Sequence, residues 1–317
     1  MTTNNIQENI QEIDNQEITS SEVSHIEEAK PVHEVTIYAE PLFKIGDFQV
    51  TNSLLTSWLA VFVIIIFSLI IRLKLKKVPG KLQHVFEIVL DGALSLVDQV
   101  TNDRKISNKI FPVVFSVFVF ILINNWLGIL PFIGSMGFYM MEEGHQVFVP
   151  LFRGGTADIN MTLTLGIVAV IGSNLFGIIT LGAWKTLNKY VKLQELGSIF
   201  TKVRKDPSVL VVAPVSFFVG IIEFIGEIAK IASLSFRLFG NIFAGEVLLS
   251  SMAAILAFVL PTPFLFLEVF IGLIQALIFS LLTTVYFTIA AQDHSEHEEH
   301  EHGHDKEKSK EGELSHI

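Results

Sequence analysis

Cysteine is absent from this chain of 317 residues. Without it the chain forms no disulfides, carries no thiolate nucleophile and offers no cysteine ligand to a metal. Histidine is also absent from the long apolar part of the chain, between His145 and His294. A zinc protease that works inside a membrane needs ligands within its spans, so this gap argues against such an enzyme. We expect the chain to use no metal and no cofactor.

Signals for nucleic acid, nucleotide and secretion are missing as well. No extended basic patch is present, which makes nucleic acid an unsuitable partner. The segment at Pro79 reads PGKL and lacks both the earlier glycine and the hydroxyl residue of a phosphate-binding loop. We therefore expect no nucleotide hydrolysis by this chain. The polar N-terminus has no basic start followed by an apolar core, so it does not resemble a cleaved signal peptide.

Apolar sequence is what the chain has in excess. Hydrophobic residues make up 50% of it and the mean hydropathy is +0.54, which is typical of several membrane spans. Runs long enough to cross a bilayer lie at about 55–73, 109–133 and 161–183, before a longer C-terminal region. Residues 79–100 place apolar side chains at helical spacing against acidic ones. This pattern predicts an amphipathic helix on the membrane surface, or equally a helix packed on soluble partner subunits.

The region 207–260 has two interpretations. No proline lies between Pro214 and Pro261, which favours one continuous helix over two spans broken near residues 227–237. About 46 residues at 1.5 Å each give roughly 70 Å, more than twice the hydrocarbon thickness of a bilayer. Such a helix has to lie steeply tilted. The segment PTP, beginning at Pro261, then turns the chain back, and a last apolar helix runs to about Ala291.

These runs predict an all-α integral membrane protein with about five transmembrane helices, one surface amphipathic helix and a long, steeply tilted C-terminal helix pair. The membrane domain covers residues 39–292, between a disordered acidic tail at 1–38 and a disordered tail rich in His and Glu at 293–317. Basic residues cluster after the first and third spans, whereas the loop from Gly134 to Asp158 is poor in them. The positive-inside rule then places the N-terminus outside and the C-terminus in the cytoplasm.

The C-terminal tail contains a zinc-protease pattern by letter, because His300, Glu301 and His304 satisfy HExxH. That motif requires a stable helix and a shaped cavity. Here Gly303 lies inside it and the surrounding sequence is charged. A solvated tail is therefore preferred over a zinc site.

Ionisable residues occur within the C-terminal apolar region, where a charge at bilayer depth costs at least about 2.5 kcal/mol. Helical geometry at 100° per residue places a stripe of small and polar residues along the face of Arg237. The stripe consists of Glu223, Gly226, Lys230, Ser233, Asn241, Ala244 and Ser251, with Gly240 at its edge. Small side chains around one arginine allow another helix to approach closely.

Glu246 points away from this stripe, so we do not expect it to pair with Arg237. On the last helix, Glu268 and Gln275 share a face with Tyr286. An arginine keeps its charge and cannot relay protons, but it can hold an approaching carboxylate in the ionised form. Glu246 and Glu268 can take up and release protons.

A purely structural role is the alternative for these charges. Arg237 would then pair with Glu223, Glu227 or another buried acid and fix the bundle. Lys230 and Glu223 could simply extend toward the cytoplasmic surface. Because ionisable residues inside a membrane are usually functional, we prefer the functional interpretation for Arg237.

Five segments resemble subunit a of the F-type ATP synthase, the stator beside a rotating ring of c subunits. They are AEPLFKIGDFQVTNSLLTSWL (39–59), NNWLGILP (124–131), ADINMTL (157–163), SLSFRLFGNIFAGEVLL (233–249) and IQALIFSLLTTVY (274–286). Their order and spacing hold over roughly residues 39–291, so together they are far more specific than RLFGN alone.

The resemblance implies a role for each polar residue. Arg237 takes the place of the essential stator arginine that faces the carboxylate of a c subunit. Positions matching the proton path and the surroundings of the arginine are Glu246, Glu268, Asn241, Gln275 and Ser233; those near the outer inlet are Asp158 and Asn160; those toward the cytoplasmic outlet are Glu223 and Lys230. Glu268 falls where some members of the family carry histidine.

The resemblance also implies a non-catalytic stator subunit in the inner (plasma) membrane of the cell. Its partners would be the c-ring, the peripheral-stalk b subunits and membrane lipid. The subunit would form two proton half-channels against the ring and couple proton flow to rotation and ATP synthesis. Sodium is the alternative ion, since the ring largely sets that choice.

A self-contained secondary transporter is the rival class. Such a protein would show inverted repeats and helix breaks at corresponding places. The sequence shows neither, and its strong intramembrane charges all fall in the C-terminal half.

Overall fold

The computed structural model describes residues 39–76, 80–130, 136–142, 145–183, 186, 209–256 and 259–292. In chain order its elements are β1 (Pro41–Ile45), β2 (Phe48–Thr51), α3 (Asn52–Lys74), α4 (Lys81–Thr101), α5 (Arg104–Ile129), β3 (Gly137–Glu142), β4 (His145–Pro150), the 3-10 turn η1 (Gly155–Ala157), α6 (Ile159–Leu181), α9 (Val209–Ile255) and α10 (Pro261–Ala291). The two predicted tails and the pattern at His300 lie outside the described residues.

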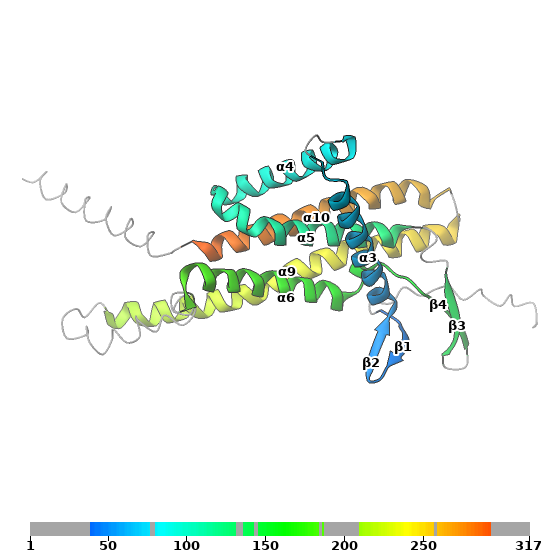
Figure 1. The fold of residues 1–317 in the computed structure, drawn as a ribbon. Helices are drawn as coiled ribbons and strands as arrows, with labels where there is room; N and C mark the ends of the chain where they lie inside the picture. The colour runs from blue at the N-terminus through cyan, green and yellow to red at the C-terminus, as the bar shows by residue number, and fades with distance from the viewer. Residues whose placement is uncertain are drawn as a thin grey trace, which may run out of the picture.

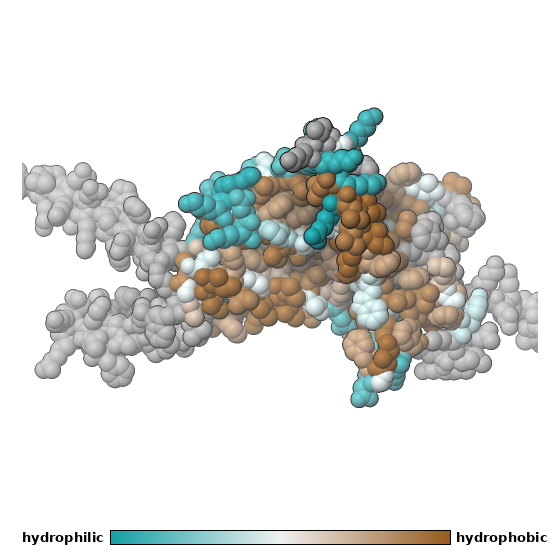
Figure 2. Space-filling model, in the orientation of Figure 1, coloured by the Kyte–Doolittle hydropathy of each residue, from teal (hydrophilic) through white to brown (hydrophobic). Residues whose placement is uncertain are grey.

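Five helices in the described part of the chain are long and apolar enough to cross a membrane: α3, α5, α6, α9 from Phe218, and α10. The prediction of an all-α membrane protein with five spans is thereby confirmed. Figure 2 shows apolar surface over these helices, with hydrophilic residues gathered over α4 and at the tip of the β1–β2 hairpin. In a soluble protein so much exposed apolar surface would promote association, whereas here it suits contact with lipid.

The first span begins where the β1–β2 hairpin ends. Thr51 closes β2 and caps α3, because its hydroxyl accepts a hydrogen bond of 3.3 Å from the backbone N–H of Leu54. The helix then continues through a largely apolar run, and its last turn carries Arg72 and Lys74. Basic side chains in the last turn interact favourably with the negative end of the helix dipole.

The amphipathic helix predicted at 79–100 is α4. It packs against α5 and α10, yet its apolar residues Val85, Ile88 and Val89 remain exposed. An exposed apolar face fits either a membrane surface or a partner subunit, so both alternatives remain open.

α4 and α5 meet at a tight corner. Asn102 ends α4 with a φ of 52°, a left-handed conformation that asparagine tolerates better than most residues. The carboxylate of Asp103 then accepts a hydrogen bond of 2.7 Å from the backbone N–H of Lys105 and caps α5.

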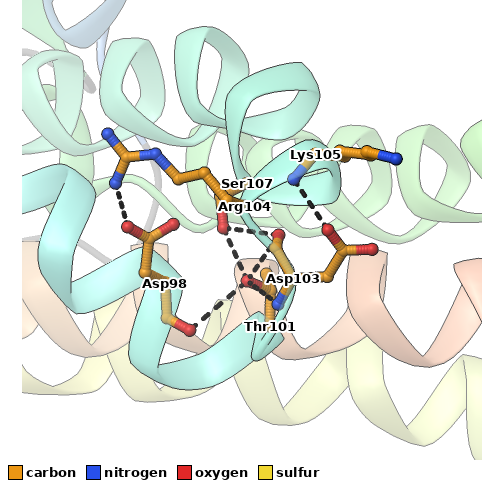
Figure 3. A network of polar contacts seen from close by, with 6 residues as sticks. All are labelled: Asp98, Thr101, Asp103, Arg104, Lys105 and Ser107. Atoms are coloured by element: carbon orange, nitrogen blue, oxygen red, sulfur yellow. Dashed lines mark hydrogen bonds and ion pairs between the residues drawn. The ribbon is translucent and has the colours of Figure 1, made fainter.

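Side chains brace this corner across the turn (Figure 3). The hydroxyls of Thr101 and Ser107 lie 2.6 Å apart, and Ser107 also donates to the backbone oxygen of Asp103. Arg104 forms an ion pair with Asp98. The corner thus fixes α4 along the side of α5.

α9 is a single continuous helix of 47 residues, so the one-helix prediction is confirmed and the two-span alternative is wrong. At 1.5 Å per residue it is about 70 Å long. α10 begins with Pro261 in its first turn. A backbone N–H at this position would have no hydrogen-bond partner within the helix, so proline, which lacks one, is tolerated there. It packs back along α9.

The helices do not all run in the same direction. α5, α6, α9 and α10 lie side by side, while α3 crosses them at a large angle (Figure 1). A helix of 23 residues is about 35 Å long and matches a bilayer when it stands nearly upright. The bundle is then steeply inclined, as the length of α9 requires.

Two short antiparallel hairpins, which the sequence did not predict, pair β1 with β2 and β3 with β4. The second hairpin leads through η1 into α6 and lies toward the end of the bundle where α9 turns into α10 (Figure 1). We call this the hairpin end and the opposite end, beside the α4–α5 corner, the corner end.

An apolar core lies between the two ends. Its buried members are contributed by all four inclined helices and include Ile121 of α5, Ala169 of α6, Leu234 and Leu238 of α9, and Phe279 of α10. α6 can approach α9 because Gly166 faces Ser235, and a side chain at this position would collide with that residue. Close helix approach through a small residue is a common packing mode in membranes.

Candidate functional site

Arg237 lies on α9 with its side chain exposed. Leu234 and Leu238, 1% and 0% exposed, face the core from the same helix and leave Arg237 at the edge of the packed interior. Its Nη2 donates a hydrogen bond of 3.4 Å to Oγ of Ser233. No ion pair joins Arg237 to any residue in the described ranges, so the alternative in which a neighbouring acid neutralises it finds no support.

The stripe predicted around Arg237 is open. A Cβ added at Gly226 or Gly240 would meet no atom within 4 Å. Ser233, Asn241 and Ala244, which belong to the same stripe, are exposed. The face beside the arginine is therefore lined by small groups and has room for another helix to approach.

Asn241 connects this stripe to α10. Its Nδ2 donates a hydrogen bond of 2.8 Å to Oε1 of Gln275, which is buried. The sequence placed both residues in the surroundings of Arg237, and the structure brings the two together one turn from it.

A second polar group lies on α9 toward the corner end. Nζ of Lys230 lies 2.7 Å from Oε1 of Glu227 and 5.3 Å from the ring centre of Tyr286 on α10. Nδ2 of Asn174 on α6 donates to the other oxygen of Glu227 at 3.2 Å. Lys230 is thus held within the bundle rather than simply extended to the surface. Glu223 lies one turn before Glu227 and is half-buried.

At the hairpin end, Glu246 is paired with a residue that the sequence analysis passed over. Arg153, in the loop between β4 and η1, donates from Nε and Nη2 to both carboxylate oxygens of Glu246 at 3.0–3.2 Å. The side chain of Arg153 is 3% exposed and that of Glu246 is 28% exposed. Glu246 indeed points away from Arg237, as helical geometry predicted.

Glu268 is buried on α10 and lies directly against Gly245 of α9, where a Cβ would collide with its carboxylate. Together with Asn241 it contributes polar atoms to a pocket of about 210 Å³ whose other lining residues are mainly apolar. A pocket of this size has room for several water molecules.

Buried amides tie the surrounding helices together. Asn125 of α5 donates from Nδ2 to the backbone oxygen of Gly272 on α10 and accepts from the hydroxyl of Thr156. Asn124 accepts from the hydroxyl of Ser57 on α3. These contacts satisfy the buried polar groups, join α5 to α3 and α10, and hold η1 against α5.

Asp158 caps α6, because its Oδ1 accepts a hydrogen bond of 3.0 Å from the backbone N–H of Asn160. Burial raises the pKa of Asp158 above its ordinary value of 3.8, against the lowering effects of that hydrogen bond and of the charge of Arg153. Asn160 itself is exposed. Asp158 and Glu246 therefore both lie within the influence of Arg153.

The predicted residues thus fall into three groups along the bundle. Asp158, Glu246 and Glu268 belong to the hairpin end, Arg237 with Ser233, Asn241 and Gln275 to the middle, and Lys230 with Glu223 toward the corner end. The sequence did not identify Arg153, although it is the only Lys or Arg between Gly134 and Asp158. A single basic residue in a loop otherwise free of them was the available signal.

Comparison with known proteins gives one consistent result. The family model described as ATP synthase A chain matches residues 54–288. A protein named ATP synthase subunit a from Syntrophobacter fumaroxidans is 30% identical over 248 residues, covering 78% of this chain and 87% of that protein. Proteins of the same name from Geotalea daltonii (30% over 230 residues, 73% and 83% covered) and Mycobacterium tuberculosis (31% over 254 residues, 78% and 89% covered) are similar to the chain to the same degree.

Proposed function

This chain belongs to the family of the ATP synthase A chain, and we propose that its Arg237 acts on carboxylates that a ring of c subunits carries past α9. The chain is accordingly a stator subunit in the membrane sector of an F-type ATP synthase and crosses the membrane several times. It works together with other subunits of that enzyme.

The state of Arg237 supports this role more than any other observation. The arginine is exposed on a helix within the membrane and forms no ion pair among the described residues. A charge in such a place is costly unless something compensates it. The open stripe that includes Gly226 and Gly240 allows a partner helix to bring a carboxylate to it.

Two half-channels lead to this point in the proposed mechanism. A proton enters at the hairpin end past Asp158, Asn160, Glu268 and Glu246 and neutralises a ring carboxylate. The neutral group can rotate through lipid, whereas an ionised one would be too costly to bury. After nearly a full turn it releases its proton toward Glu223 and Lys230 at the corner end, and Arg237 stabilises the resulting anion.

Ser233, Asn241 and Gln275 position the arginine in this scheme. Arg237 also blocks a direct leak, because a permanent positive charge repels protons that would pass from one half-channel to the other. The membrane potential supplies about 2.3 kcal/mol per charge for each 100 mV. The transported ion is the proton, with sodium as the alternative that the ring decides.

The remaining assignments follow from the same function. The subunit itself is non-catalytic and touches the c-ring, the peripheral-stalk b subunits and lipid. It lies in the inner (plasma) membrane with its N-terminus outside and its C-terminus in the cytoplasm. Residues 39–292 form the membrane domain between the tails at 1–38 and 293–317.

Arg237→Ala tests the proposal in the assembled complex. We expect ATP-driven proton pumping into inverted vesicles to fall to background, while the amount of the subunit in the membrane stays normal. Arg72→Ala, at the end of α3, is the matched control and should pump as the wild type does. Normal pumping by Arg237→Ala would refute the assigned role. Repeating the assay with and without sodium identifies the ion.

A further inference from the structure

The pair formed by Arg153 and Glu246 connects the loop before η1 to the middle of α9. Nε of Arg153 lies 3.0 Å from Oε1 and 3.2 Å from Oε2 of Glu246, and Nη2 lies 3.0 Å from Oε2. The guanidinium thus engages both carboxylate oxygens in a forked arrangement. Such bidentate pairs are the strongest of the charged hydrogen bonds.

Because Arg153 is buried, losing the compensating charge would cost more here than in a surface ion pair. The side chain of Arg153 is 3% exposed, and an arginine remains protonated at any pH that a folded protein meets. A buried cation requires a compensating anion close by. Glu246 supplies a compensating charge as long as it stays ionised, and protonating it would remove an acceptor that the guanidinium uses.

Glu268 lies in a different environment, although it is close to Glu246. It is 5% exposed, and no hydrogen bond or ion pair joins it to another residue in the part of the chain that the structure describes. Its carboxyl group borders the pocket that Asn241 also lines. Water that enters this pocket would lie beside the carboxyl group of Glu268 and exchange protons with it.

Among the described residues, few other charges act on the two acids. Glu246 is faced by Arg153 from the loop and by Glu268 from α10. On its own helix the nearest basic residue is Arg237, about 13 Å further along the axis at 1.5 Å per residue. Arg153 also acts on Asp158, which caps α6.

We infer that Arg153 is a positioning residue that holds Glu246 as a fixed anion, and that Glu268 is the member of this acid pair that gains and loses the transported proton. The inference rests on the proposed function and refines it. Glu246 would then supply a fixed negative charge at the proton inlet rather than carry the proton itself. A fixed negative charge beside Glu268 attracts protons to the pocket without itself becoming neutral.

The test compares Arg153→Gln, Glu246→Gln, Arg153→Gln/Glu246→Gln and Glu268→Gln in the assembled ATP synthase. ATP-driven proton pumping is measured in inverted vesicles and divided by the amount of assembled complex. Each single change removes one of the two charges of this pair and leaves the other without that compensation, so we expect about tenfold slower pumping from either. The double variant removes both charges and should recover to within about threefold of the wild type. Glu268→Gln should remain at least about tenfold slower.

The opposite pattern would overturn the inference. If Glu246 itself carries the proton, the double variant stays as slow as Glu246→Gln, and Glu268→Gln pumps nearly as well as the wild type. The dependence of pumping on pH supplies a second readout, because a purely structural role for Arg153 would not change it. We expect the profile to change in Arg153→Gln, where Glu246 becomes free to bind a proton, and to return to the wild-type shape in the double variant.

Assembly is the necessary control. If the double glutamine variant does not assemble, Arg153→Met/Glu246→Met fills the same space with apolar side chains and replaces it. Arg237→Ala is measured in parallel, since its normal pumping would refute the proposed function itself. If the double variant does not recover while Arg237→Ala is inactive, only the role given to Arg153 is refuted.

Discussion

Asn241 of α9 and Gln275 of α10 are joined by a hydrogen bond of 2.8 Å between Nδ2 and Oε1. The glutamine is buried, while the asparagine is exposed on the stripe that carries Arg237. The contact therefore fixes the spacing of the two long helices one turn from the arginine. It connects the packing of the bundle with the position of the proposed site.

Breaking this contact from one side should cost more than removing it altogether. Asn241→Ala leaves the amide of Gln275 buried without this partner, which costs about 1–3 kcal/mol. Asn241→Ala/Gln275→Leu replaces the buried amide by an apolar group and should recover most of that loss. Denaturant titration of the purified subunit in detergent measures both. Equal losses for the single and double variants would show that the bond contributes nothing to stability.

The open stripe predicts a substitution that folds but does not function. Gly240→Leu should insert into the membrane at normal levels, because a Cβ added there meets no atom within 4 Å. It should nevertheless reduce pumping at least about tenfold, since it occupies the space of the proposed ring helix. Immunoblots of membranes and pumping assays in vesicles separate the two effects.

Gly166→Leu is the matched contrast for Gly240→Leu. Already its Cβ would collide with Ser235 and lie 3.1 Å from the backbone oxygen of Ile231. We expect this variant to accumulate poorly, because α6 and α9 can no longer pack closely. Normal pumping by Gly240→Leu would remove the stripe from the proposed interface.

The raised pKa of Asp158 predicts how stability depends on pH. The folded protein binds the proton of this buried acid more tightly than the unfolded chain does. The stabilisation that the protonated Asp158 gives the folded state is therefore complete below about pH 3.8 and is lost as the pH rises through the pKa of Asp158 in the folded protein. Asp158→Asn keeps a side-chain oxygen to cap α6, so it should be more stable than the wild type above this window and similar below it.

Melting curves of the purified subunit between about pH 3 and pH 8 check this prediction. Asp158→Ala serves as the control, because it removes the cap together with the titrating group and should be about 1 kcal/mol less stable than Asp158→Asn at every pH. Parallel curves for Asp158→Asn and the wild type would contradict the assignment of a raised pKa.

Much of the fold was accessible from local sequence. The continuous helix α9 follows from the absence of proline after Pro214 and from its apolar composition, and both properties are set by neighbours in the chain. The predicted start of the second span at 109 was late because the helix extends back through a charged turn to Arg104, where Asp103 caps it. Helix caps and corners depend on single side chains, whose effect is lost when hydropathy is averaged over a window of residues.

The site was only partly accessible. The stripe around Arg237 could be read from helical geometry, because all its members lie on one helix. Arg153 could not be paired with Glu246 in this way, since 93 residues separate them and only packing of the loop on α9 brings them together. The same reason applies to Asn174 and Glu227, which come from different helices.

The apolar core between the two ends of the bundle also has an electrical consequence. Glu227 and Glu246 lie about 28 Å apart along α9 at 1.5 Å per residue, and the side chains that face inward between them include Leu234 and Leu238. These buried apolar side chains make it costly for a charge to cross the interior of the bundle directly. In the proposed mechanism, rotation of the c-ring carries the charge past this core, so the proton current and the rotation rate are two measures of the same event.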